Sequence, residues 1–122
     1  MAAERFGTEI VKHQVVMAAV ADVVMDAYAV DSMVARTRQS ASAAGLDPVK
    51  VAMTHAYAAD AISRSGERAR RALCASSEGS ALEKHLAAIA PLFAFRPFDP
   101  AALRETVVLA AEEAGGYPLT IA

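Results

Sequence analysis

The sequence predicts an all-α fold, and in particular an antiparallel four-helix bundle. Apolar residues recur at spacings of three and four along most of the chain, which is the period of a helix. The chain lacks the strict alternation of apolar and polar residues that a half-buried strand needs, and it lacks NG and DG hairpin turns. A chain of 122 residues, of which 55% are hydrophobic, can bury a core without disulfides or a metal. We therefore expect a single helical-bundle domain over residues 1–122.

A first, long helix is predicted over about residues 8–39. Its main apolar stripe follows alternating spacings of four and three, at Val16, Val20, Val23, Ala27, Val30 and Val34. A second set widens this stripe, namely Met17, Ala21, Val24 and Tyr28. We therefore expect the helix to be buried on more than one side, with Asp22 and Asp26 on its polar edge.

A second helix is predicted over about residues 48–76. Asp47 supplies an N-cap side chain, and Pro48 fits the first helical position because its fixed φ suits a helix start. Gly66 lies in the middle and costs about 1 kcal/mol relative to alanine, which indicates a close helix crossing or a slight bend. Alanine supplies much of the apolar fraction, so we expect a core of small side chains.

A third, shorter helix is predicted over about residues 80–91. Ser80 and Glu83 form a capping-box pattern, in which each side chain accepts a hydrogen bond from a backbone N–H of the first turn. Pro91 kinks or ends this helix because proline has no N–H to donate. The three phenylalanines of residues 93–98 then predict a packed hydrophobic corner, with a docking surface as the alternative.

A fourth helix is predicted over about residues 100–114. Asp99 and Pro100 repeat the signal of a capping side chain followed by proline. Gly115 and Gly116 supply the stop, because glycine readily adopts the left-handed conformation that ends many helices. The fourth helix completes the predicted bundle.

Composition argues against several classes of protein. A net charge of −2 does not suit a general nucleic-acid binder, which needs a basic surface to displace counterions from phosphate. Cys74 is the only cysteine, so an internal disulfide is impossible, and we expect this residue to pack as a small core hydrophobe. The front of the chain has no secretory signal and no apolar run of the roughly 20 residues that cross a bilayer. We therefore expect a cytoplasmic location.

The sequence contains no motif for a complete active site. GxGxxG, the P-loop, HExxH, GxSxG and CxxC are all absent. None of His13, His55 and His85 stands three residues after a glutamate, so the Glu-x-x-His signature of di-iron bundles is missing. We therefore expect no catalytic, cofactor-binding or metal-binding residues on this chain.

The candidate site is a structural polar network. Its predicted members are Asp22, Asp26, Asp60, Arg64 and Arg68. Two aspartates one turn apart on an apolar helix could instead form a carboxylate pair for metal binding or acid–base chemistry. We favour pairing with arginines of the second helix, because a half-buried carboxylate needs a cationic partner. Asp60 also precedes Arg64 by four residues, the favourable spacing for an ion pair within one helix.

Arginines are dense over residues 64–71, in the segment RSGERARR. A phosphate-binding or membrane-surface patch is one interpretation of such a segment. Glu67 and Arg71 form an ion pair of favourable spacing within it, so a solvated, salt-bridged face is the interpretation we favour.

Several of these patterns resemble the C-terminal helical region of acyl-CoA dehydrogenases. The likeness is to the very-long-chain-like members, which carry an extra helical domain after their catalytic core. In the first helix it rests on Ala21-Asp22, Asp26, the run Ala27 to Val30, and the segment Arg36 to Ser40. It continues with Asp60 and Arg64 in the second helix, and with the stretch Leu109 to Gly116 at the end of the fourth. The resemblance covers about residues 12–117.

The resemblance implies a role in an oxidoreductase of fatty acid metabolism. Members of the family oxidise acyl-CoA thioesters to trans-2-enoyl-CoA, with FAD as hydride acceptor and a glutamate as the base. No position here matches those catalytic or flavin-contact motifs, so FAD is expected on the parent enzyme and not on this chain. The implied partner is the catalytic core of such an enzyme, and the implied assembly is a homodimer. Long-chain relatives associate with membranes, but this chain has no strong basic amphipathic segment to support that trait.

Two alternatives to an accessory domain remain open at this stage. One is a standalone helical protein–protein interaction module that docks through the phenylalanine corner or the first helix. The other is a small bundle that binds a flavin or a CoA ester, with arginines on the pyrophosphate.

Overall fold

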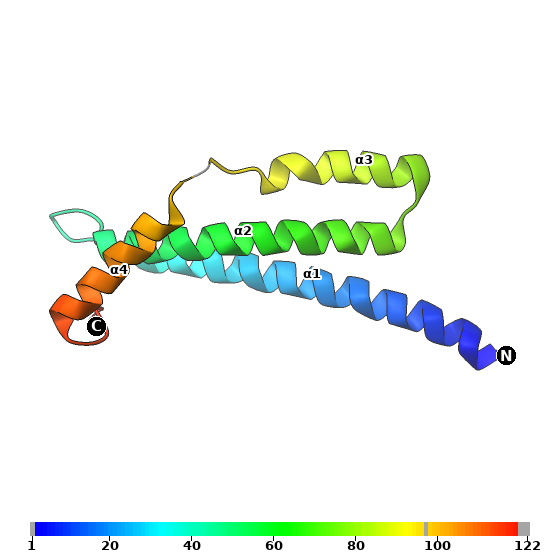
Figure 1. Ribbon diagram of the computed structural model, residues 1–122, viewed down its shortest axis with the longest axis horizontal. Helices are drawn as coiled ribbons and strands as arrows, with labels where there is room; N and C mark the ends of the chain where they lie inside the picture. The colour runs from blue at the N-terminus through cyan, green and yellow to red at the C-terminus, as the bar shows by residue number, and fades with distance from the viewer. Residues whose placement is uncertain (1, 97, 120–122) are drawn as a thin grey trace. The chain divides into compact units, whose positions relative to one another are not determined.

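The computed structural model confirms the all-α prediction, and it describes residues 2–96 and 98–119. Four α-helices and one short 3-10 helix follow each other, and the described residues form no strand (Figure 1). The elements are α1 (Ala2–Gln39), α2 (Pro48–Ser76), α3 (Gly79–Ile89), η1 (Ala90–Phe93) and α4 (Pro100–Ala114). Within α1, nothing is described for the side chains of residues 2–8, 10 and 12.

The bounds of α2 and α4 match the predicted ranges of residues 48–76 and 100–114. The first helix begins at Ala2 and not at about residue 8, because Glu4, Arg5 and Gly7 do not interrupt the helical backbone. The third helix ends at Ile89, where Pro91 enters the first turn of η1. A 3-10 turn accommodates the missing proline N–H at this point.

Two of the predicted helix starts have the expected capping geometry. The Asp47 carboxylate accepts a hydrogen bond from the backbone N–H of Val49 at 2.8 Å. The Asp99 carboxylate accepts from the N–H groups of Ala101 and Ala102, at 2.9 and 3.4 Å. Both aspartates therefore satisfy donors that a helix start would otherwise leave unpaired.

The predicted capping box at the start of α3 is wrong. The helix begins one residue earlier than expected, so Glu78 and not Ser80 occupies the N-cap, and the Glu78 side chain forms no capping hydrogen bond. Gly79 has a positive φ of 57°. The tight turn after Ser76 uses this left-handed glycine, and it moves the helix start away from the residue that could have capped it.

Helix α4 ends as predicted. Gly115 adopts the left-handed conformation, with φ of 66°. Its N–H donates to the carbonyls of Ala111 and Glu112, and the N–H of Gly116 reaches Ala111 at 3.0 Å. These bonds satisfy carbonyls that the helix end leaves without intrahelical donors.

The described residues fall into two compact units, and each is described by itself. Unit 1 comprises described residues of Met1–Ala27 and Ile62–Phe95, and unit 2 those of Tyr28–Ala61 and Arg96–Ala122. Helices α1 and α2 each contribute one segment to both units.

In unit 1, the N-terminal part of α1 runs antiparallel to the C-terminal part of α2, and α3 folds back along α2 (Figure 1). Gly66 is buried where η1 returns to α2. A Cβ atom added at Gly66 would lie 3.2 Å from the Cβ and Cγ atoms of Phe93. The close approach that Gly66 suggested is therefore a helix-to-phenylalanine contact, and Phe93 supplies the packed part of the predicted corner.

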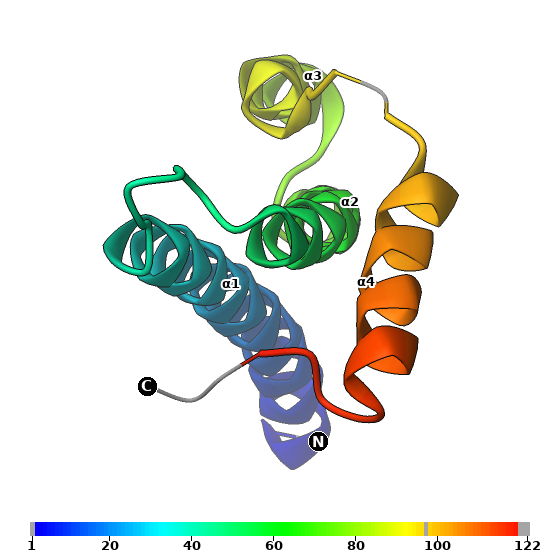
Figure 2. The same ribbon diagram turned by 90° about the vertical axis from the view of Figure 1, so that its left-hand side faces the viewer.

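In unit 2, residues 28–39 of α1 and residues 48–61 of α2 lie with α4, and the segment after α4 turns back toward α1 (Figure 2). Thr37 and Thr54 are buried, and their hydroxyl oxygens lie 3.0 Å apart. Thr54 donates its single hydroxyl hydrogen to the carbonyl of Lys50 at 2.8 Å, so Thr37 is the donor between the two threonines.

The core consists of small side chains, as predicted. Among the described residues, the buried hydrophobic ones are all alanines of α2, namely Ala52, Ala61 and Ala72. No large side chain of the described residues is fully buried. Small side chains at a helix interface let two backbones approach closely, which brings polar groups on neighbouring helices within hydrogen-bonding distance.

Candidate functional site

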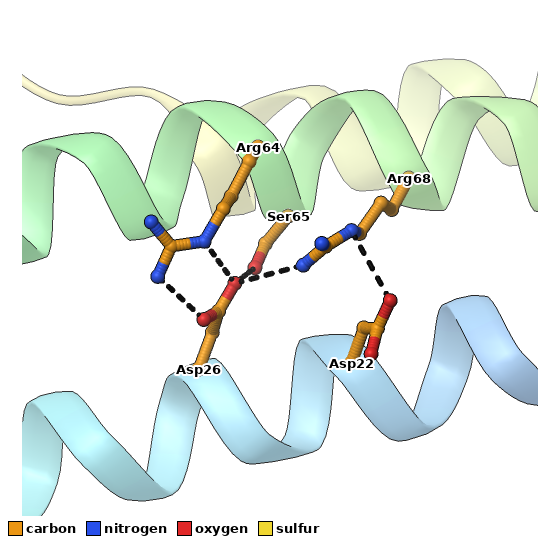
Figure 3. A network of polar contacts seen from close by, with 5 residues as sticks. All are labelled: Asp22, Asp26, Arg64, Ser65 and Arg68. Atoms are coloured by element: carbon orange, nitrogen blue, oxygen red, sulfur yellow. Dashed lines mark hydrogen bonds and ion pairs between the residues drawn. The ribbon is translucent and has the colours of Figure 1, made fainter.

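The Asp26 carboxylate is the centre of the best-formed polar site in unit 1 (Figure 3). Asp26 belongs to α1 and is only 8% exposed. The Arg64 guanidinium of α2 donates two hydrogen bonds to this carboxylate, from Nη2 to Oδ1 at 2.6 Å and from Nε to Oδ2 at 2.9 Å. Such bidentate pairs are the strongest ion pairs that proteins form, because geometry and charge act together.

Three further groups complete this polar cluster, as Figure 3 shows. Ser65 donates its hydroxyl to Oδ2 of Asp26 at 3.0 Å, and Arg68 reaches the same oxygen at 3.3 Å. The Nε atom of Arg68 also lies 3.3 Å from Oδ2 of Asp22. One guanidinium therefore bridges two carboxylates that stand one turn apart on α1. We call Asp22, Asp26, Arg64, Ser65 and Arg68 the Asp26 cluster.

The electrostatics of the Asp26 cluster favour ionised carboxylates. Hydrogen bonding by Arg64 lowers the pKa of Asp26 below its usual value of 3.8, burial opposes this shift, and the Ser65 hydroxyl and the charge of Arg68 add to it. Two arginines face two aspartates, so the cluster carries no net charge. Every buried side-chain nitrogen or oxygen of the described residues has a hydrogen-bond partner, so this buried charge is fully compensated.

Helical periodicity explains why these residues meet. Ala61, Ser65, Arg68 and Ala72 follow one another at spacings of four, three and four, so they share one face of α2. The alanines on this face are buried. Their small size lets the Asp26 carboxylate reach the Ser65 hydroxyl between the two helices. The sequence prediction missed Ser65, although its place in a stripe of small residues was a usable signal.

Asp60 does not belong to the Asp26 cluster, which corrects the predicted network. Asp60 lies in unit 2, where its carboxylate pairs with Arg104 of α4 at 3.1 Å. Successive residues of a helix differ by about 100° in direction, so Asp60 points away from the face that Ala61 occupies. Arg104 is the second residue that the sequence prediction missed, since no local spacing connects two residues on different helices.

The arginine-rich segment forms the salt-bridged face that we favoured. Glu67 pairs with Arg71 at 2.8 Å and with Arg70 at 3.6 Å, and all three side chains are at least half exposed. An exposed pair of this kind contributes little to stability. Arg64 and Arg68 point instead into the Asp26 cluster, so this segment divides its arginines between two faces of α2.

The structure also places Cys74 and the phenylalanines of the predicted corner. Cys74 is exposed, so its predicted place in the core is wrong, because it lies outside the buried stripe that ends at Ala72. In the predicted phenylalanine corner, Phe98 lies in unit 2 with its ring 6.3 Å from the His55 ring. Pro97, part of the same predicted corner, lies outside the described residues.

The chemistry open to the Asp26 cluster is limited. A general base must be accessible and have a pKa near the working pH, whereas Asp26 is buried and its pKa is lowered. The described residues contain no group of three His, Cys, Asp or Glu side chains that could hold a metal ion. The ion pairs and hydrogen bonds of the cluster join α1 to α2 within unit 1.

The outer face of α1 in unit 1 is apolar. Met17, Val20 and Val24 are each more than half exposed, and their spacings of three and four place them on one face of the helix. The prediction that α1 is buried on more than one side is therefore wrong for the described residues, because α2 covers only the face that carries Asp26. No helix searched among the described residues is long and apolar enough to span a membrane.

Comparison with known proteins relates this chain to a family. The model of the family described as "Acyl-CoA dehydrogenase, C-terminal domain" matches residues 1–90. A curated relative, "Probable acyl-CoA dehydrogenase" of Bacillus subtilis (strain 168), is 31% identical over 99 residues. The match covers 80% of this chain but only 17% of the relative. Comparison with solved structures gave no match. The resemblance seen in the sequence is thus confirmed, and the chain belongs to the family of acyl-CoA dehydrogenase C-terminal domains.

Proposed function

We propose that this chain is the C-terminal accessory and assembly domain of an acyl-CoA dehydrogenase-like, FAD-dependent oxidoreductase of fatty acid oxidation. Its own role is packing, and the flavin and catalytic base belong to the parent enzyme. The observation that carries this proposal is membership of the C-terminal domain family over residues 1–90. A location in the cytoplasm and a homodimeric assembly remain predictions.

The internal chemistry of unit 1 supports a packing role. The Asp26 cluster is the group of charged residues that most resembles a catalytic site. Its charged side chains form ion pairs with one another. The Asp26 carboxylate accepts hydrogen bonds from two guanidinium groups and a hydroxyl and is buried between the helices, so little of it is open to a substrate. The cluster thus stabilises a scaffold.

The apolar outer face of α1 supplies a surface for the partner. Met17, Val20 and Val24 expose a contiguous stripe, and apolar patches of this kind mark protein interfaces. We assign this stripe to the catalytic part of the enzyme, because the matched stretch represents only 17% of the relative's length. The remaining length is where a catalytic part would lie.

Affinity purification from the source organism tests this proposal. The tagged chain is expected to bring down a polypeptide that is itself an acyl-CoA dehydrogenase and that shows flavin absorbance. The double variant Met17→Gln/Val24→Gln should lose this partner. The control Val108→Gln changes an apolar residue of α4 that is also more than half exposed, and it should retain the partner.

The standalone interaction module is the alternative that the same experiment addresses. An exposed apolar face of α1 suits a partner of any kind, so the identity of the partner decides. Capture of a non-flavin protein that the double variant loses would favour the alternative. Capture of the flavoprotein by wild type and double variant alike would contradict the assigned face.

A further inference from the structure

Unit 2 contains a cavity with a volume of about 740 Å³. Volumes between about 300 and 1,000 Å³ are typical of sites for small molecules. Its walls come from the end of α1, the start of α2 and the segment after α4. The lining residues are Ser32, Met33, Arg36, Thr37, Gln39, Ser40, Lys50, Met53, Thr54, Tyr117 and Leu119.

The charge of this cavity has one sign. Arg36 comes from the last turn of α1 and Lys50 from the first turn of α2, and none of the described residues that line the cavity is acidic. Within the part of the chain that the structure describes, neither cationic side chain forms an ion pair or hydrogen bond. This contrasts with Arg64 and Arg68, which are neutralised by the carboxylates of the Asp26 cluster.

The remaining lining is uncharged: it consists of apolar side chains, hydroxyl groups and the Gln39 amide. Met33, Met53, Tyr117 and Leu119 offer flexible and apolar surface, and methionine adapts well to irregular ligands. The buried hydroxyls of Thr37 and Thr54 are already bonded to each other and to the Lys50 carbonyl. Because these hydroxyls are already hydrogen-bonded, the charge of a ligand falls to Arg36 and Lys50.

We propose that this cavity binds an amphipathic anion, in which a carboxylate or phosphate head is joined to an apolar chain. Arg36 offers a planar fork that matches either oxyanion, and Lys50 adds a second positive charge. The methionines, Tyr117 and Leu119 receive the apolar chain. This binding site is separate from the Asp26 cluster, and it does not depend on the proposed role in a flavoenzyme.

Titration of the full 122-residue chain with dodecanoate and with dodecyl phosphate, below their micelle concentrations, tests the proposal by calorimetry. At least one of the two should bind at a single site, and the tighter one identifies the head group. Arg36→Gln and Lys50→Gln should each weaken binding by about tenfold, the typical effect of losing a charge-assisted hydrogen bond. Arg38→Gln, which removes a neighbouring cation outside the lining, should change the affinity less than about twofold.

Matched ligands distinguish specific binding from non-specific hydrophobic association. Dodecanol, which has the apolar chain without the charge, and inorganic phosphate, which has the charge without the chain, should both bind much more weakly than the amphipathic anions. Circular dichroism of each variant checks that the helices are intact. Absence of binding by both anions would overturn the proposal. Equal binding of dodecanol, or an Arg38→Gln loss as large as that of Arg36→Gln, would overturn it as well.

Discussion

Helices α1 and α2 meet in both units, but through different chemistry. In unit 1 the contact is charged, with a nearly buried carboxylate held by two guanidinium groups and a hydroxyl. In unit 2 the contact is neutral, with the Thr37 and Thr54 hydroxyls 3.0 Å apart. The cost of losing one partner differs greatly between them, because an unpaired buried charge is far more expensive than an unpaired hydroxyl.

In a core built of alanines, the charged contact determines how the two helices are aligned. Faces of alanine define the register between two helices poorly, because small side chains do not interdigitate. A bidentate pair tolerates little displacement, so the Asp26 cluster selects one register between the segments of unit 1. An exposed ion pair, such as that of Asp60 with Arg104, is solvated and constrains the register between helices much less.

The largest expected effect comes from Asp26→Ala. It removes the acceptor that Arg64, Ser65 and Arg68 share, and only Arg68 keeps a second carboxylate, that of Asp22, so the free energy of unfolding should fall by about 2–3 kcal/mol. Arg64 is 37% exposed and regains water, which keeps the loss below that of a fully buried pair. Chemical denaturation measures it. Asp22→Ala, which breaks only a half-exposed contact, is the control, and an equal loss there would remove the distinction between the two aspartates.

Acid should reveal the same contact through the lowered pKa of Asp26. A carboxylate whose native pKa is depressed stabilises the fold fully above its unfolded pKa, and that contribution disappears as pH falls through the native value. The stability difference between wild type and Asp26→Asn should therefore be constant at neutral pH and shrink below pH 3.8, the usual value. Urea denaturation between neutral and acidic pH measures this difference. A difference independent of pH would show that the ionised carboxylate does not matter.

The neutral contact of unit 2 should respond more weakly and asymmetrically. Thr54→Val leaves the Thr37 hydroxyl without its acceptor, and we expect a loss of about 1 kcal/mol. Thr37→Val leaves Thr54 still bonded to the Lys50 carbonyl, so its loss should be smaller. Thermal unfolding of both variants gives the order, and the reverse order would mean that the proton lies on the other oxygen.

The smallest effect is expected for Asp60→Asn. Both partners of the Asp60 and Arg104 pair are more than half exposed, so stability should change by less than about 0.5 kcal/mol. The same denaturation series measures it beside Asp26→Ala. A loss as large as that of Asp26→Ala would break the comparison, since exposure would then not decide the value of an ion pair.

Sequence reasoning reached the helices because their signals are local. The apolar spacing in α1, the Asp–Pro pairs at Asp47 and Asp99, and the glycine stop at Gly115 each act within a few residues. The capping box at Ser80 failed because Gly79, with its positive φ, started α3 one residue too early for it. The residue at which α3 begins depends on the geometry of the preceding turn, and the capping-box pattern gives no information about that turn.

The candidate site was only half predictable for a related reason. Asp22, Asp26, Arg64 and Arg68 could be brought together by charge and periodicity on two long helices. Asp60 was misplaced because its spacing to Arg64 suggested one cluster, whereas its partner Arg104 lies 44 positions away. Tertiary packing decides such pairs, and a single sequence gives no direct view of it.

Whether this chain works as part of a flavoenzyme can be decided by size-exclusion chromatography of a source-cell extract, with an antibody against this sequence and flavin absorbance recorded together. We expect the antibody signal to elute with flavin and well above 12.7 kDa, either as part of a longer enzyme or bound to one. Elution at 12.7 kDa without flavin would overturn the proposed function, because the chain would then act apart from any flavoenzyme.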